Sequence, residues 1–326
     1  MLETDSTGEA RANISPGTYG VVTSATVKAH PQINLTIASF NFTLGDATST
    51  TPGPNVTVAD AEAFWRGFNQ VFAFGIPTVD AGGYLWTICM PAGNGSYSMQ
   101  VRVQLPGFTP AGAAAFVEPL LDRLNRIGIP ADITTPTTQV YSSQTKSTGR
   151  TSNAYFASRL FPRKAYQNPV LFSAAMAAAR AAVEAGYIFH GLNMAPTLKV
   201  AGDPAPAGLN PVWRDIVMHA DVIADVDMAT LTPAEQAVVQ RRLNGYMDAL
   251  REATPGGGAY FNEADILEPN WQQSFFGSNY DELRRIKSER DPWHVFWAPR
   301  TPGSEAWAVQ SPDELPTQNG RLCRVD

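Results

Sequence analysis

The sequence is poor in cysteine and in charge. Only two cysteines occur among its 326 residues, and charged residues make up 17% of it. Two cysteines are too few to establish a disulfide framework. Cys89 lies in an apolar run and is predicted to be a buried thiol. The net charge of −6 is spread without long runs of one sign, so neither nucleic acid nor an anionic membrane is an expected partner.

Long apolar segments are missing as well. No run approaches the roughly 20 residues of a membrane-spanning helix, and residues 1–13 are too polar for the apolar core of a signal peptide. The sequence has no H-E-x-x-H, paired C-x-x-C, G-x-S-x-G, P-loop or G-x-G-x-x-G motif. Metal-dependent hydrolysis, nucleotide hydrolysis and Rossmann-type dehydrogenation therefore lose support. His190 and His219 lie on predicted strands without metal-ligand spacing, so we interpret both as structural.

Glycosylation sequons are frequent near the start. Five N-x-S/T triplets begin at Asn13, Asn34, Asn41, Asn55 and Asn94. This density suits passage through the secretory pathway. We therefore expect a secreted protein rather than a cytosolic one.

Hydrophobic periodicity predicts an α+β fold, with an antiparallel sheet flanked by helices. Alternating or β-branched segments predict strands at 17–30, 34–44 (with a bulge before Phe40), 84–90, 97–105, 154–161, 185–192 and 212–223. Helical stripes with caps predict helices from Thr57 to Gly75, from Thr109 to Gly128, at 171–184, after the Thr232–Glu235 capping box, and from Ser278 to Asp291.

Three motifs lie close together near the C-terminal end: GAYFNEAD at 258–265, EPNWQQ at 268–273 and FFGSNY at 275–280. We expect a strand at Tyr260 and a loop at 271–273. Together the motifs resemble the C-terminal signature of the berberine-bridge-enzyme-like FAD-linked oxidases, within the vanillyl-alcohol oxidase superfamily and its fungal alcohol-oxidase-like branch. Near the other end, GTYGVVTSATVK at 17–28 resembles the last strand-forming segment of that family's flavin domain.

The resemblance implies three parts. Residues 1–30 would be the end of the FAD-binding domain, 31–255 the substrate domain, and 256–326 a segment that returns to pack on the flavin domain. Because the flavin-domain match begins near residue 17, we expect most of that domain to be missing. The groups that tether FAD and cradle its pyrophosphate would be missing with it, so the chain alone is expected to bind FAD poorly. Cys323 could pair with a cysteine of the missing part.

The resemblance also implies roles for individual residues. Tyr260 would accept the proton of the hydroxyl being oxidised, and Asn262 would contact the flavin. A phenol can act in this way only when a neighbouring group stabilises its anion. If Tyr260 is only a structural aromatic residue, the base would lie near Arg214 and His219.

Further cofactor contacts are implied at the N-terminal match. Gly17 and Gly20 would let the backbone approach FAD, and Val21 and Val22 would line its adenine side. On the predicted strand 212–223, Trp213 is expected in the core, and Arg214 would be a substrate contact on the opposite face.

The function that the resemblance implies is FAD-linked oxidation of an alcohol or natural-product substrate in fungal secondary metabolism, with oxygen as electron acceptor. The alternative is a flavin-free, degenerate family member that serves as a binding protein or as a partner subunit. Redox-neutral cyclisation on the same scaffold remains open at this stage.

Overall fold

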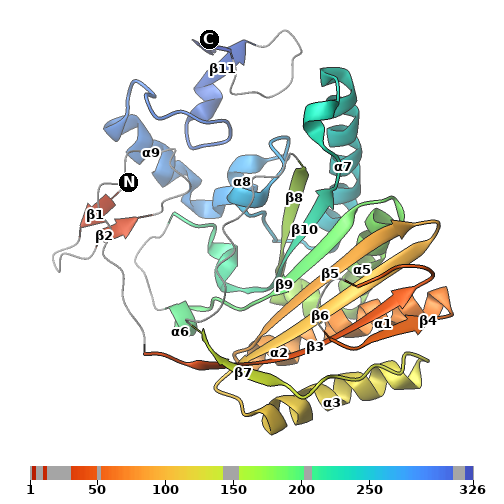
Figure 1. Ribbon diagram of the computed structural model, residues 1–326. Coiled ribbons are helices and arrows are strands. Elements are labelled where there is room, and N and C mark those ends of the chain that lie inside the picture. Colours follow the sequence, from red (N-terminus) through yellow and green to blue (C-terminus); the bar gives the residue numbers. More distant parts are fainter. Residues whose placement is uncertain are drawn as a thin grey trace.

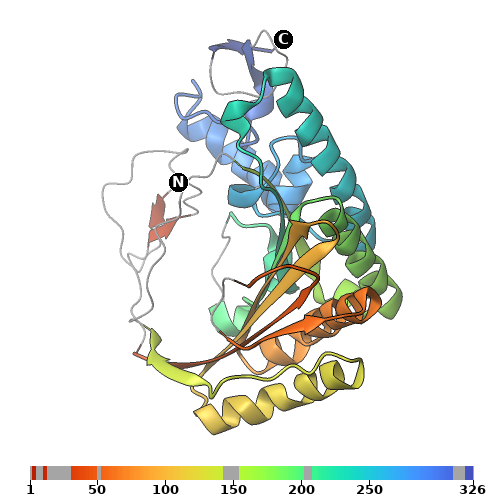
Figure 2. The same ribbon diagram turned by 45° about the vertical axis from the view of Figure 1, so that its right-hand side comes forward.

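An eight-stranded sheet with helices on one face forms the centre of the molecule (Figures 1 and 2). The computed structural model describes residues 2–4, 10–12, 31–49, 53–141, 154–201, 208–310 and 320–325. The strand order is β4-β3-β6-β5-β9-β10-β8, and β7 pairs with β3. All neighbours in this sheet are antiparallel except β3 and β4. The strands are β3 Asn34–Leu44, β4 Asn55–Val58, β5 Tyr84–Gly93, β6 Ser96–Pro106, β7 Thr137–Val140, β8 Tyr155–Pro162, β9 Ile188–Asn193 and β10 Ile216–Ala224.

The two faces of the sheet differ in chemistry. In β10, Met218 and Ala220 belong to the hydrophobic core, whereas His219 and Asp221 alternate with them and point to the other face. The core face is the one that the helices cover. We call the opposite face, which carries His219 and Asp221, the open face.

Capped amphipathic helices cover the core face. Asp60 caps α1 with its carboxylate, Thr109 caps α3 with its hydroxyl, and Thr232 and Glu235 form the predicted capping box of α7. The N-cap of α1 is Asp60, so the start predicted at Thr57 is wrong, because Thr57 still belongs to β4. The helices are α1 Ala61–Ala73, α2 Gly75–Asp80, α3 Pro110–Arg126, α4 Arg163–Gln167, α5 Pro169–Glu184, α6 Leu198–Ala201 and α7 Pro233–Ala253.

Strand β3 has apolar residues on both faces of the sheet, and it has no bulge. The register between β3 and β6 is continuous, so the bulge predicted before Phe40 is wrong. Phe40 and Phe42 face the helices, while Leu35 and Ile37 face the other way, at the end of β3 that β7 pairs with. Two different burial environments on one strand produced the misleading pattern.

The strand predicted over 212–223 begins later than expected. Pro211–Arg214 form a 3-10 helix, η2, and β10 starts only at Ile216. The Asn210 side chain caps η2 by accepting a hydrogen bond of 3.1 Å from the Val212 N–H. Trp213 and Arg214 therefore do not alternate across the sheet.

The C-terminal part packs as a helical layer with its own small core. Trp271, Phe275 and Phe276 are buried there, with Ala259. The loop predicted at 271–273 is wrong, since this stretch begins a helix. The elements are η4 Phe261–Glu263, α8 Trp271–Phe276, α9 Tyr280–Arg290, and the strand pair β11 Trp307–Gln310 and β12 Arg321–Arg324.

Polar contacts join this layer to α7. The Asp265 carboxylate accepts hydrogen bonds of 2.9 Å from both Gln240 and Asn244. Arg251 donates to both carboxylate oxygens of the buried Glu268. Such two-point contacts fix direction as well as distance, so the layer is held in one orientation against the sheet domain.

Some expectations fall outside what can be described. The predicted strand 17–30 lies outside the described residues; near it, only β1 Leu2–Thr4 and β2 Ala10–Ala12 are described, as an antiparallel pair. Cys89 is fully buried, as predicted. Within the described ranges, no helix has both the length and the apolar character needed to cross a membrane.

Candidate functional site

Tyr260 is held at the edge strand of the sheet by its backbone. Its N–H donates a hydrogen bond of 2.8 Å to the Ser158 hydroxyl, which donates one of 3.3 Å back to the Tyr260 carbonyl. Two residues earlier, the Gly258 carbonyl accepts a bond of 2.8 Å from the Leu160 N–H. The strand predicted at Tyr260 is therefore a single bridge to β8 followed by an extended residue.

Three rings meet where Tyr260 reaches the open face. The Tyr260 ring lies edge-on to His219 at 5.4 Å between centroids and edge-on to Trp213 at 5.3 Å. The Trp213 and His219 rings are 5.8 Å apart. The prediction that Trp213 joins the core is wrong, because η2 places its indole in this ring cluster instead.

Asn262 contacts Tyr260 directly. Its side-chain amide donates a hydrogen bond of 2.8 Å to the Tyr260 hydroxyl. A donor at that oxygen stabilises negative charge developing there. The predicted role of Asn262 as a flavin contact stays a prediction.

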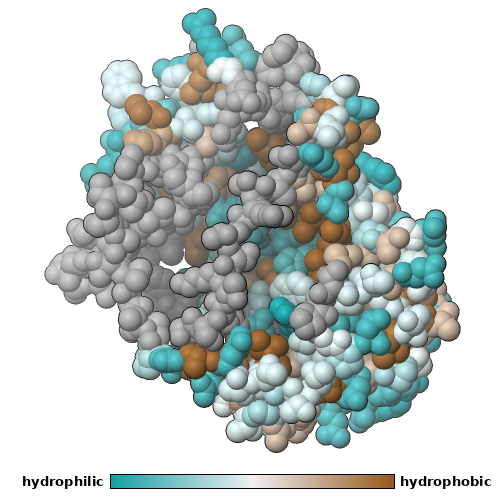
Figure 3. Space-filling model, viewed as in Figure 1, coloured by the Kyte–Doolittle hydropathy of each residue, from teal (hydrophilic) through white to brown (hydrophobic). Residues whose placement is uncertain are grey.

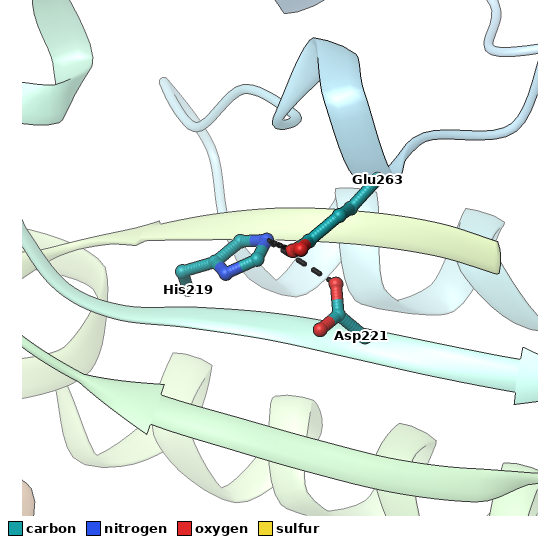
Figure 4. Close-up of side chains that lie close together, drawn as sticks. All are labelled: His219, Asp221 and Glu263. Carbon is teal, nitrogen blue, oxygen red and sulfur yellow. Dashed lines mark ion pairs between the residues drawn. The ribbon is translucent and has the colours of Figure 1, made fainter. Parts of the chain in front are cut away.

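Four titratable side chains gather beside the rings, on β9, β10 and η4. The Nδ1 atom of His190 lies 3.3 Å from one Asp221 oxygen, and the Nε2 atom of His219 lies 3.2 Å from the other. Glu263 approaches from η4, with 3.6 Å between its Oε2 and the same His219 nitrogen. Figure 4 shows one ring nitrogen of His219 facing both carboxylates. His219 and Asp221 are only 2% and 3% exposed.

Burial and neighbouring charge move the two carboxyl groups in opposite directions. For Asp221, burial favours the neutral acid, but the hydrogen bond from His190 and the charges of the His219 and His190 imidazoles outweigh it and hold its pKa below the ordinary value. For Glu263, burial and the negative charge of Asp221 raise the pKa. Burial, followed by the charges of Asp221 and Glu263, also raises the pKa of Tyr84 on β5. The negative charges of Asp221 and Glu263 thus influence their neighbours across the open face.

The remaining predicted residues lie elsewhere. The Arg214 guanidinium donates a hydrogen bond of 3.0 Å to the Pro196 carbonyl, and its role as a substrate contact stays a prediction. Gly17, Gly20, Val21 and Val22 lie outside the described residues.

Sequence reasoning missed Asp221, Glu263 and the link to His190. A partial signal existed: His219 and Asp221 are two residues apart on a strand and so share a face. Antiparallel pairing places His190 opposite Asp221, which the sequence does not reveal by itself.

Comparison with known proteins shows what this chain is similar to. The family model described as "Berberine and berberine like" matches residues 259–301, which include Tyr260 and Asn262. The chain is 31% identical to the FAD-linked oxidoreductase sor8 of Hypocrea jecorina and 29% identical to the FAD-linked oxidoreductase ZEB1 of Gibberella zeae. Residues 259–301 thus match the berberine-like family, and the chain as a whole is similar to FAD-linked oxidoreductases.

These alignments cover 95% and 94% of this chain but half of each relative. Among solved structures of the superfamily, the VAO-type flavoprotein MtVAO615 from Myceliophthora thermophila C1 superposes with a TM-score of 0.74 and 25% identity, over 95% of this chain and 53% of that one. The chain thus spans about half the length of the berberine-bridge-enzyme-like relatives that it matches.

The open face also carries buried polar atoms next to an aromatic ring. Two buried polar atoms on it, Nε2 of His190 and Nε of Arg102, have no hydrogen-bond partner within the described ranges. Trp86 lies between them, 5.5 Å from the His190 ring and 5.8 Å below the Arg102 guanidinium. Figure 3 shows hydrophilic and hydrophobic residues side by side in the middle of the view.

Proposed function

We propose that this chain forms the substrate-facing half of an FAD-linked oxidase that oxidises an alcohol group of a natural product and returns the electrons to oxygen. Bound FAD would take up the hydride from the carbinol carbon. The observation that carries the proposal is the fixed position of Tyr260, whose backbone is bound to Ser158 and whose hydroxyl is bound to Asn262.

Tyr260 accepts the hydroxyl proton of the substrate in this proposal. Loss of a hydride from an alcohol carbon leaves a protonated carbonyl unless the O–H proton leaves in step, so a positioned acceptor is needed. Negative charge on the Tyr260 oxygen is stabilised by the Asn262 amide, 2.8 Å away. The Trp213 and His219 rings pack against the sides of the phenol and restrict its movement.

Similar proteins favour a natural-product substrate. A bifunctional decalin synthase, calF, of Penicillium decumbens is 29% identical over 95% of this chain and 51% of its own length. The aromatic side chains Trp86 and Trp213 give the site a flat apolar surface on which a ring system can stack. We propose the same division as the sequence suggested, with 31–255 as the substrate domain.

We also propose passage through the secretory pathway. Three of the sequon asparagines, Asn34, Asn55 and Asn94, are exposed. Asn94 lies at the tip of the β5–β6 hairpin, where an oligosaccharyltransferase can reach it.

The test is anaerobic reduction of the flavin. FAD-loaded protein is mixed with a panel of ring-bearing alcohols, and the flavin spectrum is followed, first without oxygen and then after oxygen is admitted. We expect reduction by an alcohol, no reduction by its methyl ether, which lacks the hydroxyl proton, and reoxidation with release of hydrogen peroxide. Flavin that stays bound but oxidised with every alcohol would contradict the proposal and favour the binding-protein alternative.

A further inference from the structure

We infer that His219, Asp221 and Glu263 form a binding site for one divalent transition-metal ion of the Zn²⁺ type. These residues offer one imidazole nitrogen and two carboxylate oxygens, and the three ligand atoms lie within 4.8 Å of one another. One His and two carboxylates form a plausible three-ligand set for zinc, with a fourth position left open. This site adjoins Tyr260 through the His219 ring, but metal binding there does not depend on the proposed hydride chemistry.

The two distances from His219 are compatible with a shared ion. An ion about 2.0–2.2 Å from each ligand holds two ligands of a tetrahedral site about 3.3–3.6 Å apart. The observed separations from His219 Nε2 are 3.2 Å to Asp221 and 3.6 Å to Glu263. Despite these short distances, neither the His219 nitrogen nor the nearer Asp221 oxygen has a hydrogen-bond partner in the described part of the chain.

Burial makes these unsatisfied atoms informative. His219 and Asp221 are 2% and 3% exposed, and a buried polar atom without a partner destabilises the folded protein. Both atoms point toward the same place, the gap that Glu263 closes from η4 (Figure 4). A cation in that gap would satisfy all three residues at once.

The local charge points the same way. Among the described residues, the ion pairs recorded for Asp221 and Glu263 are with His190 and His219, and none is with a lysine or an arginine. With neutral imidazoles, two carboxylates thus face each other without a permanent positive charge. A divalent ion would balance them.

The surrounding residues support a metal ligand set. His190 Nδ1 lies 3.3 Å from the Asp221 oxygen that faces away from the gap, which is the kind of outer contact that orients a ligating carboxylate. The Trp213 and Tyr260 rings pack against the His219 ring and fix its plane. Glu263 has a 43% exposed side chain and provides the route by which an ion enters.

The competing explanation is a protonated His219 that bridges the two carboxylates as an ion pair. Both explanations place the same atoms together. The metal site predicts uptake of one ion per chain, whereas the ion pair predicts no specific uptake. The chain is treated with a chelator, dialysed, and titrated with Zn²⁺ by calorimetry. A parallel titration with Co²⁺ is followed by its visible absorption, which reports the coordination geometry.

We expect saturation at one ion per chain and a Co²⁺ spectrum of low coordination number. Glu263→Gln keeps size and changes a half-exposed residue, so the fold should persist while affinity falls at least about tenfold; His190→Gln should weaken binding by about 10–100-fold. The matched control is His294→Asn, since His294 lies near Trp307, away from the cluster, and has a positive φ that asparagine tolerates. The His294→Asn variant should bind Zn²⁺ with the same affinity as the unmodified chain.

Two results would overturn the inference. Absence of saturable uptake in the unmodified chain would leave the ion pair as the explanation. Uptake that is unchanged in both Glu263→Gln and His219→Gln would place the ion elsewhere on the protein.

Discussion

The Ser158 hydroxyl accepts a hydrogen bond of 2.8 Å from the Tyr260 N–H and donates one of 3.3 Å to the Tyr260 carbonyl. One buried side chain of the edge strand thus holds the residue to which we assign proton transfer. The C-terminal layer depends on this contact for the position of its functional residue, although the two are about a hundred residues apart in sequence.

Ser158→Ala should loosen Tyr260 without removing it. The substitution leaves the Tyr260 N–H without its partner, which costs about 1–3 kcal/mol of unfolding free energy. Flavin reduction in the FAD-loaded protein should slow because the phenol is less well positioned. Ser158→Thr keeps the hydroxyl and should restore most of both quantities. Equal rates in the alanine and unmodified proteins would show that Ser158 does not position Tyr260.

Gly258→Ala should separate the C-terminal layer from the sheet. A Cβ at this position would lie 2.6 Å from the Ser274 carbonyl oxygen and 2.7 Å from the Asn210 amide nitrogen. We expect a loss of about 1–3 kcal/mol in urea unfolding. The matched control is Gly245→Ala in α7, where an added Cβ meets nothing within 4 Å; it should stabilise by up to about 1 kcal/mol. The account of this interface is wrong if the two variants unfold alike.

The Lys287–Asp291 ion pair should make the C-terminal layer sensitive to acid. The two side chains are largely buried and 2.6 Å apart. Burial alone would raise the pKa of Asp291, but hydrogen bonds from Lys287 and from the Phe296 and Val295 N–H groups outweigh it, so the pKa is lowered. A lowered carboxyl pKa adds stability above the ordinary value of about 4, and this stability is lost as the pH falls through the lower folded value.

Asp291→Asn tests that ion pair. It leaves the Lys287 charge without its partner and should cost about 3–5 kcal/mol near neutral pH. Urea unfolding measured from about pH 6 down to about pH 3 should then fall less steeply with acid than in the unmodified protein. Parallel pH profiles for the two proteins would refute the assignment.

Glycans should be attached to exposed sequon asparagines and not to buried ones. Asn41 is 1% exposed within β3, whereas Asn34, Asn55 and Asn94 are exposed. When the chain is expressed through a eukaryotic secretory pathway, peptide mass spectrometry should find glycan on exposed sites and none on Asn41. Glycan at Asn41 would mean that β3 is not in the sheet when the chain is modified.

The sequence predicted the main elements because their signals are local. The capping box at Thr232 and the Thr109–Pro110 start of α3 are set by contacts within one helical turn. The 3-10 turn at Pro211–Arg214 was missed because apolar Val212 and Trp213 resemble a strand, although the proline and the Asn210 cap favour a turn.

The candidate site was predicted only in part, because its contacts join residues that are far apart in the sequence. Tyr260 and Asn262 were proposed through resemblance to a family, and their roles stay predictions. The acid–base cluster depends on pairing between β9 and β10 and on the return of η4 from a distant part of the chain. Such contacts are set by topology, and no local pattern around Glu263 indicates which histidine it will face.

The most direct measurement is the rate of anaerobic flavin reduction in Tyr260→Phe, compared with the unmodified FAD-loaded protein at saturating alcohol. Phenylalanine keeps the ring contacts with Trp213 and His219 and removes only the proton acceptor. We predict unchanged flavin content and a rate lower by about 10²–10⁴-fold, the usual contribution of a general base. Reduction at the unmodified rate would contradict the central claim, and the base would then have to be sought around His219 and Arg214.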